Sequence, residues 1–325
     1  MRITITGGAG FLGVALARSL LATRSDVEQL RLVDHVEPPD EAPDVVDDGR
    51  VEVLVGDLVE PEVVDRAVGP GTDVVYHLAS VVSAGAEADF DLGFRVNLLG
   101  TLGLLERARE LGGERDRPIR VVFASSLATY GAAAGGRTVD ATAAQRPETS
   151  YGVQKACGEL LINDYHRKGF VDGWTLRLPT VVVRPGAPNR AASGFASGII
   201  REPLAGVDVV CPVDPATVMA VISPRRVIDA FGRLLDLPTD AVGADRTIPL
   251  PGLGMRVADA IAAVRAEGGD RPIGTVRFDP DPEIQRIVDS WPARIESAPA
   301  EALGMGGDDS VAAIVRQHID DEMDR

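Results

Sequence analysis

Short apolar runs alternate with amphipathic stretches through the first half of the chain. Runs that are short and rich in Val, Ile and Leu predict strands, and they lie at 2–6, 30–34, 51–56, 73–79, 119–125 and 174–183. Stretches with helical spacing lie between them, at 11–24, 61–68, 86–111 and 150–168. The strand-like runs are continuous rather than alternating, which is typical of strands buried on both faces of a parallel sheet. The pattern predicts an α/β fold with a doubly wound parallel sheet.

This alternation ends near residue 184. The stretch RPGAPNRAASGFASG at 184–198 is rich in Pro, Gly and Ser, and only short helix-like and strand-like segments follow it. We therefore expect a nucleotide-binding domain at 1–184. Residues 185–325 are expected to form mainly a smaller, C-terminal substrate lobe that is partly interleaved with the sheet.

Three glycines follow the first predicted strand, where the chain turns into the first predicted helix. Gly7, Gly10 and Gly13 form the pattern G-x-x-G-x-x-G. In a Rossmann-like fold the first allows a tight turn, the second lets a pyrophosphate approach the backbone, and the third lets helix and strand pack closely. Phe11 and Leu12, in the first turn of the helix, would add N–H groups and the positive end of the helix dipole. A glycine-rich turn without a ligand is the simpler alternative.

An acidic residue at the end of the second predicted strand strengthens the nucleotide hypothesis. Asp34 lies 21 residues after Gly13, where a carboxylate can bind the hydroxyls of an adenosine ribose. It would repel a 2′-phosphate, and no arginine follows it immediately. The predicted cofactor is therefore NAD rather than NADP.

A second constellation consists of a tyrosine, a lysine and a serine. Tyr151 and Lys155 are spaced i, i+4, so they share one face of a predicted helix. A phenol is a weak base, with an ordinary pKa of about 10, and a nearby ammonium would favour its phenolate form. Ser125 and Ser126 end a predicted buried strand, where ligands bind in open α/β sheets. We expect Ser126 to hold the substrate oxygen beside Tyr151, with Ser125 as a further substrate contact. Chance helix spacing and a strand-end turn are the alternatives.

Together these motifs resemble the extended short-chain dehydrogenase/reductase family. The resemblance also includes GDL at 56–58, HLA at 77–79 and RVNLLGT at 95–101, and it runs from residue 1 to at least 185. It implies that Asp57 and Leu58 flank the adenine, that Ala79 follows the cofactor, and that Asn97 supports the site below the nicotinamide. Lys155 would hold the nicotinamide ribose and tune Tyr151. The residues expected near the carboxamide are Pro179, Thr180 and Val182.

Within this family, the stretches 79–97, 169–206 and 222–226 most resemble the D-erythronate dehydrogenases, which oxidise a four-carbon sugar acid at C2 with NAD. A substrate of this kind needs a cation for its carboxylate, and a guanidinium binds carboxylate through two parallel hydrogen bonds. Arg184 is our first candidate and Arg190 the second. Further hydroxyl contacts are assigned to Ser83, Asn189 and Ser193.

The chain departs from that branch at two positions. Members carry a tryptophan before the Ser-Pro-Arg sequence and a histidine just ahead of its serine, where this chain has Ala220 and Ile222. A smaller, more apolar wall would reshape the substrate end of the pocket. The expected function is hydride transfer from C2 of a small sugar acid to NAD. A nucleotide-sugar 4-epimerase or dehydratase with bound NAD, an L-threonine 3-dehydrogenase-like enzyme and a non-catalytic NAD-binding regulator remain as alternatives.

Composition narrows the partners. A net charge of −16 argues against nucleic acid and against anionic membranes, but local arginines still permit an anionic substrate. Cys157 and Cys211 are the only cysteines, too few for a disulfide framework or a zinc site. They are consistent with a reducing compartment. The N-terminus begins directly with a strand, and no apolar run approaches the ~20 residues that span a bilayer, so we expect a cytoplasmic protein. By analogy with the family, we expect a homodimer in which the helices at 86–111 and 150–168 pair.

Overall fold

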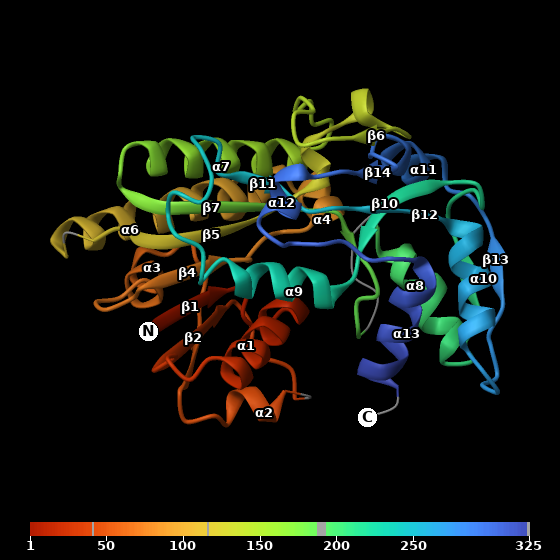
Figure 1. Cartoon of the computed structure of the whole chain (residues 1–325), viewed down its shortest axis with the longest axis horizontal. Coiled ribbons are helices and arrows are strands. Elements are labelled where there is room, and N and C mark those ends of the chain that lie inside the picture. Colours follow the sequence, from red (N-terminus) through yellow and green to blue (C-terminus); the bar gives the residue numbers. More distant parts are fainter. Residues whose placement is uncertain (41, 116, 187–192, 324–325) are drawn as a thin grey trace.

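A seven-stranded parallel sheet forms the centre of the molecule in a computed structural model that describes residues 1–40, 42–115, 117–186 and 193–323 (Figure 1). The strand order is β11-β7-β5-β4-β1-β2-β3. The order reverses between β1 and β4, which confirms the predicted doubly wound α/β fold. The strands are β1 (Arg2–Thr6), β2 (Gln29–Asp34), β3 (Val51–Val55), β4 (Val74–His77), β5 (Ile119–Ser126), β7 (Val171–Leu178) and β11 (Thr247–Pro249).

Helices cover both faces of this sheet. On one face α1 (Phe11–Thr23) and α9 (Pro224–Arg233) bury Leu16, Leu20 and Phe231 against the strands. On the other face α3 (Pro61–Ala67), α6 (Thr101–Glu114) and α7 (Ser150–Arg167) bury Leu104 and Ile162, among others. Two buried faces explain why the strands are continuous apolar runs.

The second half of the chain forms another core and also returns to the sheet. A three-stranded sheet, β12 (Leu253–Arg256), β10 (Val218–Ile222) and β8 (Thr180–Val181), packs with α8 (Gly194–Leu204), α10 (Val257–Glu267) and α13 (Val311–Glu322). From the same half, β11 pairs with β7, and α9 packs on α1. A strand from the first half of the chain, β6 (Thr138–Val139), pairs in turn with β14 (Arg294–Ile295) from the second half. Shorter elements are α2 (Pro43–Val46), η2 (Leu127–Thr129), η3 (Ala132–Ala134), β9 (Val209–Cys211), β13 (Val276–Phe278), α11 (Pro282–Asp289) and α12 (Ala298–Ala302).

Two predicted elements are divided in the structure. The single helix expected at 86–111 consists of α4 (Ser83–Ala88), α5 (Phe90–Gly93), a π-helical turn η1 (Phe94–Gly100) and α6. The strand expected at 174–183 ends at Leu178, because Pro179 has no N–H to continue the ladder, and β8 then joins the other sheet. In the part of the chain that the structure describes, no helix is long and apolar enough to cross a membrane.

Candidate active site

In the glycine loop after β1, the neighbouring backbone lies so close that there is no room for side chains. Gly7 has a φ of +70°, and a Cβ there would lie 2.7 Å from the amide nitrogen of Ala79. A Cβ on Gly13 would lie 2.2 Å from the carbonyl oxygen of Gly7. Gly10 donates its N–H to the same oxygen at 3.1 Å, and α1 begins at the next residue, Phe11. The first N–H groups of α1 have no acceptor within the helix, so this bare turn suits a pyrophosphate.

Asp34 closes the other side of this loop. Its Oδ2 accepts a hydrogen bond from the amide of Ala9 at 3.1 Å, and its Oδ1 accepts one from the amide of His35 at 2.8 Å. The carboxylate therefore stands at the end of β2 beside the glycine loop, as the ribose-binding hypothesis requires. Asp57 turns toward its own loop, where its Oδ1 accepts from the amide of Val59 at 3.1 Å, and Leu58 is buried against the sheet.

The ends of β1, β4 and β5 lie side by side, because Thr6 pairs with His77 and His77 with Phe123. The ring of His77 also forms two hydrogen bonds at these strand ends. One joins Nδ1 to Oγ1 of Thr6 at 2.7 Å, and the other joins Nε2 to Oγ1 of Thr101 at 2.9 Å. Burial lowers the pKa of His77 to about 3, so the ring is neutral at physiological pH. This buried chain fixes the strand ends that carry the site.

Tyr151 and Ser126 meet at this edge of the sheet. Ser126 ends β5, and Tyr151 is the second residue of α7, whose start is capped by the side chain of Thr149. Burial raises the pKa of Tyr151. Hydrogen bonding to Ser126, the charge of Arg184 and the hydroxyl of Ser80 act in the opposite direction. On balance the pKa of Tyr151 is raised, and these three groups limit the rise that burial causes.

Lys155 lies one turn further along α7 and is turned toward β5. Its Nζ donates to the carbonyl oxygen of Ala124 at 2.9 Å and lies 4.7 Å from the ring centre of Phe123. Burial lowers the pKa of Lys155 to about 7, while the charge of Glu159 raises it. The family resemblance implies that Lys155 tunes Tyr151. In the structure, Arg184 is the cation whose charge opposes the rise in the pKa of Tyr151, and Nζ of Lys155 is 5.7 Å from the centre of the Tyr151 ring.

Asn97 holds the loop after β4 against α7. Its Oδ1 accepts from the amide of Val81 at 2.7 Å and from Oγ of Ser80 at 3.0 Å. Its Nδ2 donates to the carbonyl oxygen of Val81 at 3.0 Å and to Oε1 of Gln154 at 2.8 Å. Asn97 therefore fixes the segment after β4 that contains Ala79 and Ser80. Ser83 follows this loop as the first residue of α4.

Arg184 reaches the site from the loop after β8. Its Nε donates to the carbonyl oxygen of Val181 at 3.1 Å, and its Nη2 donates to Oγ of Ser193 at 2.7 Å. The charged or titratable groups that act on it are Tyr151 and Arg201, so in the described part of the chain no carboxylate neutralises it. An unneutralised guanidinium whose charge acts on the phenol can bind an anionic substrate.

Several predicted site residues take other positions. Ser125 is buried and donates its hydroxyl to Glu159, so it faces away from the site, which corrects the expectation of a substrate contact. Ser193 holds Arg184 through its hydroxyl. Pro179 lies against the position of Gly252, and Thr180 is buried in β8. Asn189 and Arg190 lie outside the described residues.

The two positions at which the chain departs from the family branch, Ala220 and Ile222, lie in closely packed core. Ala220 and Ile222 are fully buried in β10, and Val182 is fully buried beside them, donating its N–H to the carbonyl oxygen of Ile222 at 2.9 Å. These side chains belong to the cores rather than to an open pocket surface. Among the described residues, no group of three or more His, Cys, Asp or Glu is placed to hold a metal ion.

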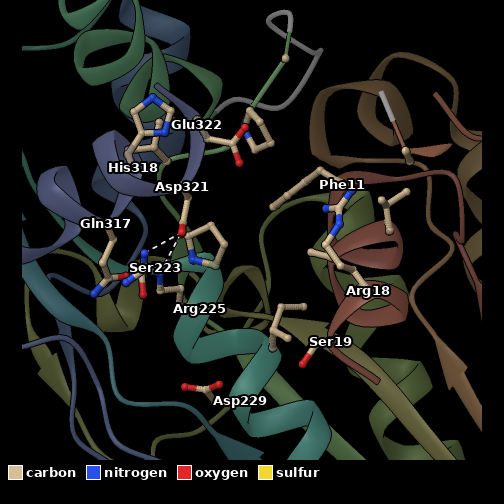
Figure 2. A pocket seen from close by; sticks show the side chains of 18 of the residues that line it. Phe11, Arg18, Ser19, Ser223, Arg225, Asp229, Gln317, His318, Asp321 and Glu322 are labelled. Carbon is tan, nitrogen blue, oxygen red and sulfur yellow. Dashed lines mark hydrogen bonds and ion pairs between the residues drawn. The ribbon is translucent and has the colours of Figure 1, made fainter. Parts of the chain in front are cut away.

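A large cleft touches the site only at its edges. It has a volume of about 880 Å³ and lies between α1, α9 and α13, with Phe11 and Arg18 on one wall and His318 and Asp321 on the other (Figure 2). Val183 and Pro185, which flank Arg184, also line it. Tyr151, Ser126 and Lys155 are not among its lining residues.

Three further residues of this site were not predicted from the sequence. Ser80 follows Ala79 directly and reaches Tyr151, and Gln154 precedes Lys155 and pairs with Asn97. Glu159 lies one helical turn after Lys155 and accepts from Ser125 and Arg177. The i, i+4 spacing of Lys155 and Glu159 was the signal available for the last of these.

The bare glycine turn and the acid at the end of β2 fit a dinucleotide. They place the molecule in the class of NAD-binding Rossmann-fold proteins. A profile of the NAD dependent epimerase/dehydratase family matches residues 3–236, and the chain belongs to that family.

Relatives of known name extend over nearly the whole chain. The D-erythronate dehydrogenase of Cupriavidus necator is 46% identical over 99% of this chain and 98% of its own length. The D-erythronate dehydrogenase of Haemophilus influenzae is 41% identical over 99% of this chain and 100% of its own length. Among solved structures, a nucleoside-diphosphate-sugar epimerase from Agrobacterium tumefaciens has a TM-score of 0.90 at 37% identity, covering 100% of this chain and 95% of that one.

Proposed function

We propose that the chain is an NAD-dependent dehydrogenase that oxidises the C2 hydroxyl of a small sugar acid, with D-erythronate as the leading substrate. The support from relatives is that both D-erythronate dehydrogenases align with it from end to end at 41% identity or more. The solved structure named as an epimerase is less similar in sequence, at 37%.

One observation carries the choice of substrate class. The charge of Arg184 acts on Tyr151, so a guanidinium lies within electrostatic range of the proposed base. In a 2-hydroxy acid the carboxylate carbon is bonded to the carbon that loses the hydride. Anchoring of that carboxylate on Arg184 would bring the adjacent hydroxyl to Tyr151.

The side chains of the site then divide the work. The Tyr151 phenolate takes the hydroxyl proton, Ser126 orients the substrate oxygen, and the two electrons of the C2–H bond leave as hydride while C2 becomes a carbonyl carbon. NAD⁺, when bound, supplies the hydride acceptor. The product is a 2-keto acid.

The remaining residues hold the cofactor. Gly7, Gly10 and Gly13 leave room for its pyrophosphate, and the carboxylate of Asp34 would bind the adenosine ribose. Lys155 would bind the nicotinamide ribose, and Asn97 fixes the loop beneath the ring through its bonds to Ser80 and Val81.

A substrate comparison tests this function. The purified protein, NAD and D-erythronate should produce NADH, and NADP should serve far less well. L-Threonine and UDP-glucose in the same assay represent the two other activities found among similar folds. NADH formation from L-threonine alone, or turnover of UDP-glucose without net reduction, would overturn the proposal.

We also propose that the protein is a homodimer through α5, η1 and α7. These neighbouring elements expose large apolar side chains: Phe90 is 58% exposed, Val153 46% and Leu160 63%. Exposed apolar patches of this kind mark protein interfaces. Light scattering at micromolar protein should give twice the mass of one chain, and Leu160→Glu should shift it to the mass of a single chain. A wild-type monomer would contradict the dimer.

We further propose a reducing, cytoplasmic setting. Both cysteines are free thiols, and Cys211 is buried. Free thiols are typical of proteins in reducing compartments.

A further inference from the structure

A buried carboxylate on α7 lies close to the proposed catalytic side chains. Glu159 is 2% exposed and lies one turn of α7 after Lys155. Its Oε1 accepts from Nε of Arg177 at 2.9 Å, and its Oε2 accepts from Nη2 of Arg177 at 2.6 Å. Ser125 and Gln145 donate further hydrogen bonds to it. Each of its two carboxylate oxygens therefore accepts two hydrogen bonds from the protein.

The partners of Glu159 lead to the site. Ser125 is the neighbour of Ser126 at the end of β5, so the hydrogen bond to Glu159 fixes the backbone that presents Ser126. Arg177 lies opposite Ser125 in the adjacent strand β7. The carboxylate thus ties the ends of two strands to α7, the helix that carries Tyr151 and Lys155.

The same carboxylate is the negative charge that acts on Lys155. Lys155 is 2% exposed, and a buried ammonium is costly unless an opposite charge offsets it. The other titratable groups near Lys155 are Tyr151 on its own helix and the neutral ring of His77 on β4. Arg177 on β7 forms an ion pair with Glu159.

We propose that Glu159 is a positioning residue of the active site, which offsets the buried charge of Lys155 and holds the strand end that carries Ser126. This deepens the proposed function and rests on it, since a charged Lys155 is what would bind the nicotinamide ribose there. Arg177 limits the effect, because it shares the negative charge of Glu159 through two hydrogen bonds.

The chain offers a matched control for a purely structural role. Asp172 lies near the other end of β7 and is also buried, with hydrogen bonds from Nε of Arg120 at 2.7 Å and from Nη2 of Arg246 at 3.3 Å. Asp172→Asn removes another buried, arginine-bound carboxylate, on strand β7 five residues before Arg177. It should cost stability without changing Lys155.

The sequence also makes Lys155 directly observable. Lysine occurs only at positions 155 and 168, so protein labelled with ¹³C-lysine gives two sets of side-chain signals by NMR. Lys168 is exposed, and Lys168→Arg assigns the spectrum. This titration needs neither cofactor nor substrate, so its outcome stands apart from the success or failure of the dehydrogenase assay.

Two variants are expected to shift the titration midpoint of Lys155 in opposite directions. Glu159→Gln should move the Lys155 titration midpoint to lower pH by about one unit, because an opposite charge has been removed. Arg177→Gln should move it to higher pH, because the charge of Glu159 is no longer shared. Cooperative thermal unfolding identifies folded variants, and if one of the two does not fold, the sign of the other decides.

Unchanged midpoints in the folded variants, or the same shift in Asp172→Asn, would overturn the proposal. In the dehydrogenase assay, Glu159→Gln should lower kcat at least tenfold, with little change in the KM for NAD. The pH above which activity is lost should fall with the Lys155 midpoint, whereas Asp172→Asn should leave the pH profile in place.

Discussion

The Nζ atom of Lys155 donates a hydrogen bond to the carbonyl oxygen of Ala124 at 2.9 Å. This bond draws the lysine into the fold and fixes it between β5 and α7. Burial lowers its pKa to about 7, against an ordinary value of 10.5. Its charge therefore depends on pH in the neutral range, where a surface lysine stays charged.

This depressed pKa predicts a pH-dependent stability. Between pH 7 and 10.5 the unfolded chain holds a proton on Lys155 that the folded chain does not, so the free energy of unfolding rises with pH in this window. Lys155→Met removes the group. Relative to this variant, the free energy of unfolding of the wild type should increase by about 1.4 kcal/mol per pH unit above pH 7. Below pH 7 the difference between the two should not change with pH. Urea unfolding at several pH values measures this, and Lys168→Met is the control. Parallel curves for the wild type and Lys155→Met would contradict it.

The glycine loop makes a prediction about close packing. Alanine in place of Gly13 would put a Cβ 2.2 Å from the carbonyl oxygen of Gly7, so Gly13→Ala should cost about 2 kcal/mol of stability and weaken NAD binding more than tenfold. Gly103→Ala, in α6, meets nothing within 4 Å and should stabilise the protein by up to about 1 kcal/mol. Thermal unfolding and calorimetric titration with NAD compare the two. Equal behaviour would show that the turn tolerates a side chain.

Asp34 predicts the choice between the two nicotinamide dinucleotides. Its carboxylate stands at the end of β2 beside the glycine loop and would repel a 2′-phosphate. Asp34→Asn should therefore raise kcat/KM for NADP relative to NAD by about a hundredfold, mainly through KM. An unchanged ratio would mean that the ribose does not bind here.

Arg184 predicts a selective loss of substrate affinity. If it binds the carboxylate, Arg184→Met should raise the KM for the sugar acid by about 10- to 100-fold, with NAD binding nearly unchanged. Arg225→Met is the matched control, because that arginine lines the neighbouring cleft and pairs with Asp321 at 2.6 Å (Figure 2). Equal effects of the two variants would remove Arg184 from the substrate site.

Much of this arrangement could be predicted from sequence, since it depends on spacing within single elements. The glycine turn, Asp34 at a strand end and Tyr151 with Lys155 on one helix face all follow from local periodicity. Serines 125 and 126 show where such reasoning stops. Neighbouring residues of a strand point to opposite faces, and only the packing of Glu159 behind β5 shows that Ser125 is turned inward.

Contacts across the fold could not be predicted. Arg184 comes from a loop after β8, and it acts on Tyr151 only because β8 leaves the main sheet after Pro179. The return of β11 to the edge of that sheet likewise depends on long-range pairing with β7, for which the sequence carries no local signal.

In the proposed reaction, Tyr151 takes the proton of the C2 hydroxyl while C2 gives a hydride to NAD. The most direct measurement uses D-erythronate with deuterium at C2 and determines the mass of the NADH formed. The wild type should yield NADH that carries one deuterium, and Tyr151→Phe should lower the rate by about 10²- to 10⁴-fold while NAD still binds. NADH without deuterium, or an unchanged rate in Tyr151→Phe, would contradict the account.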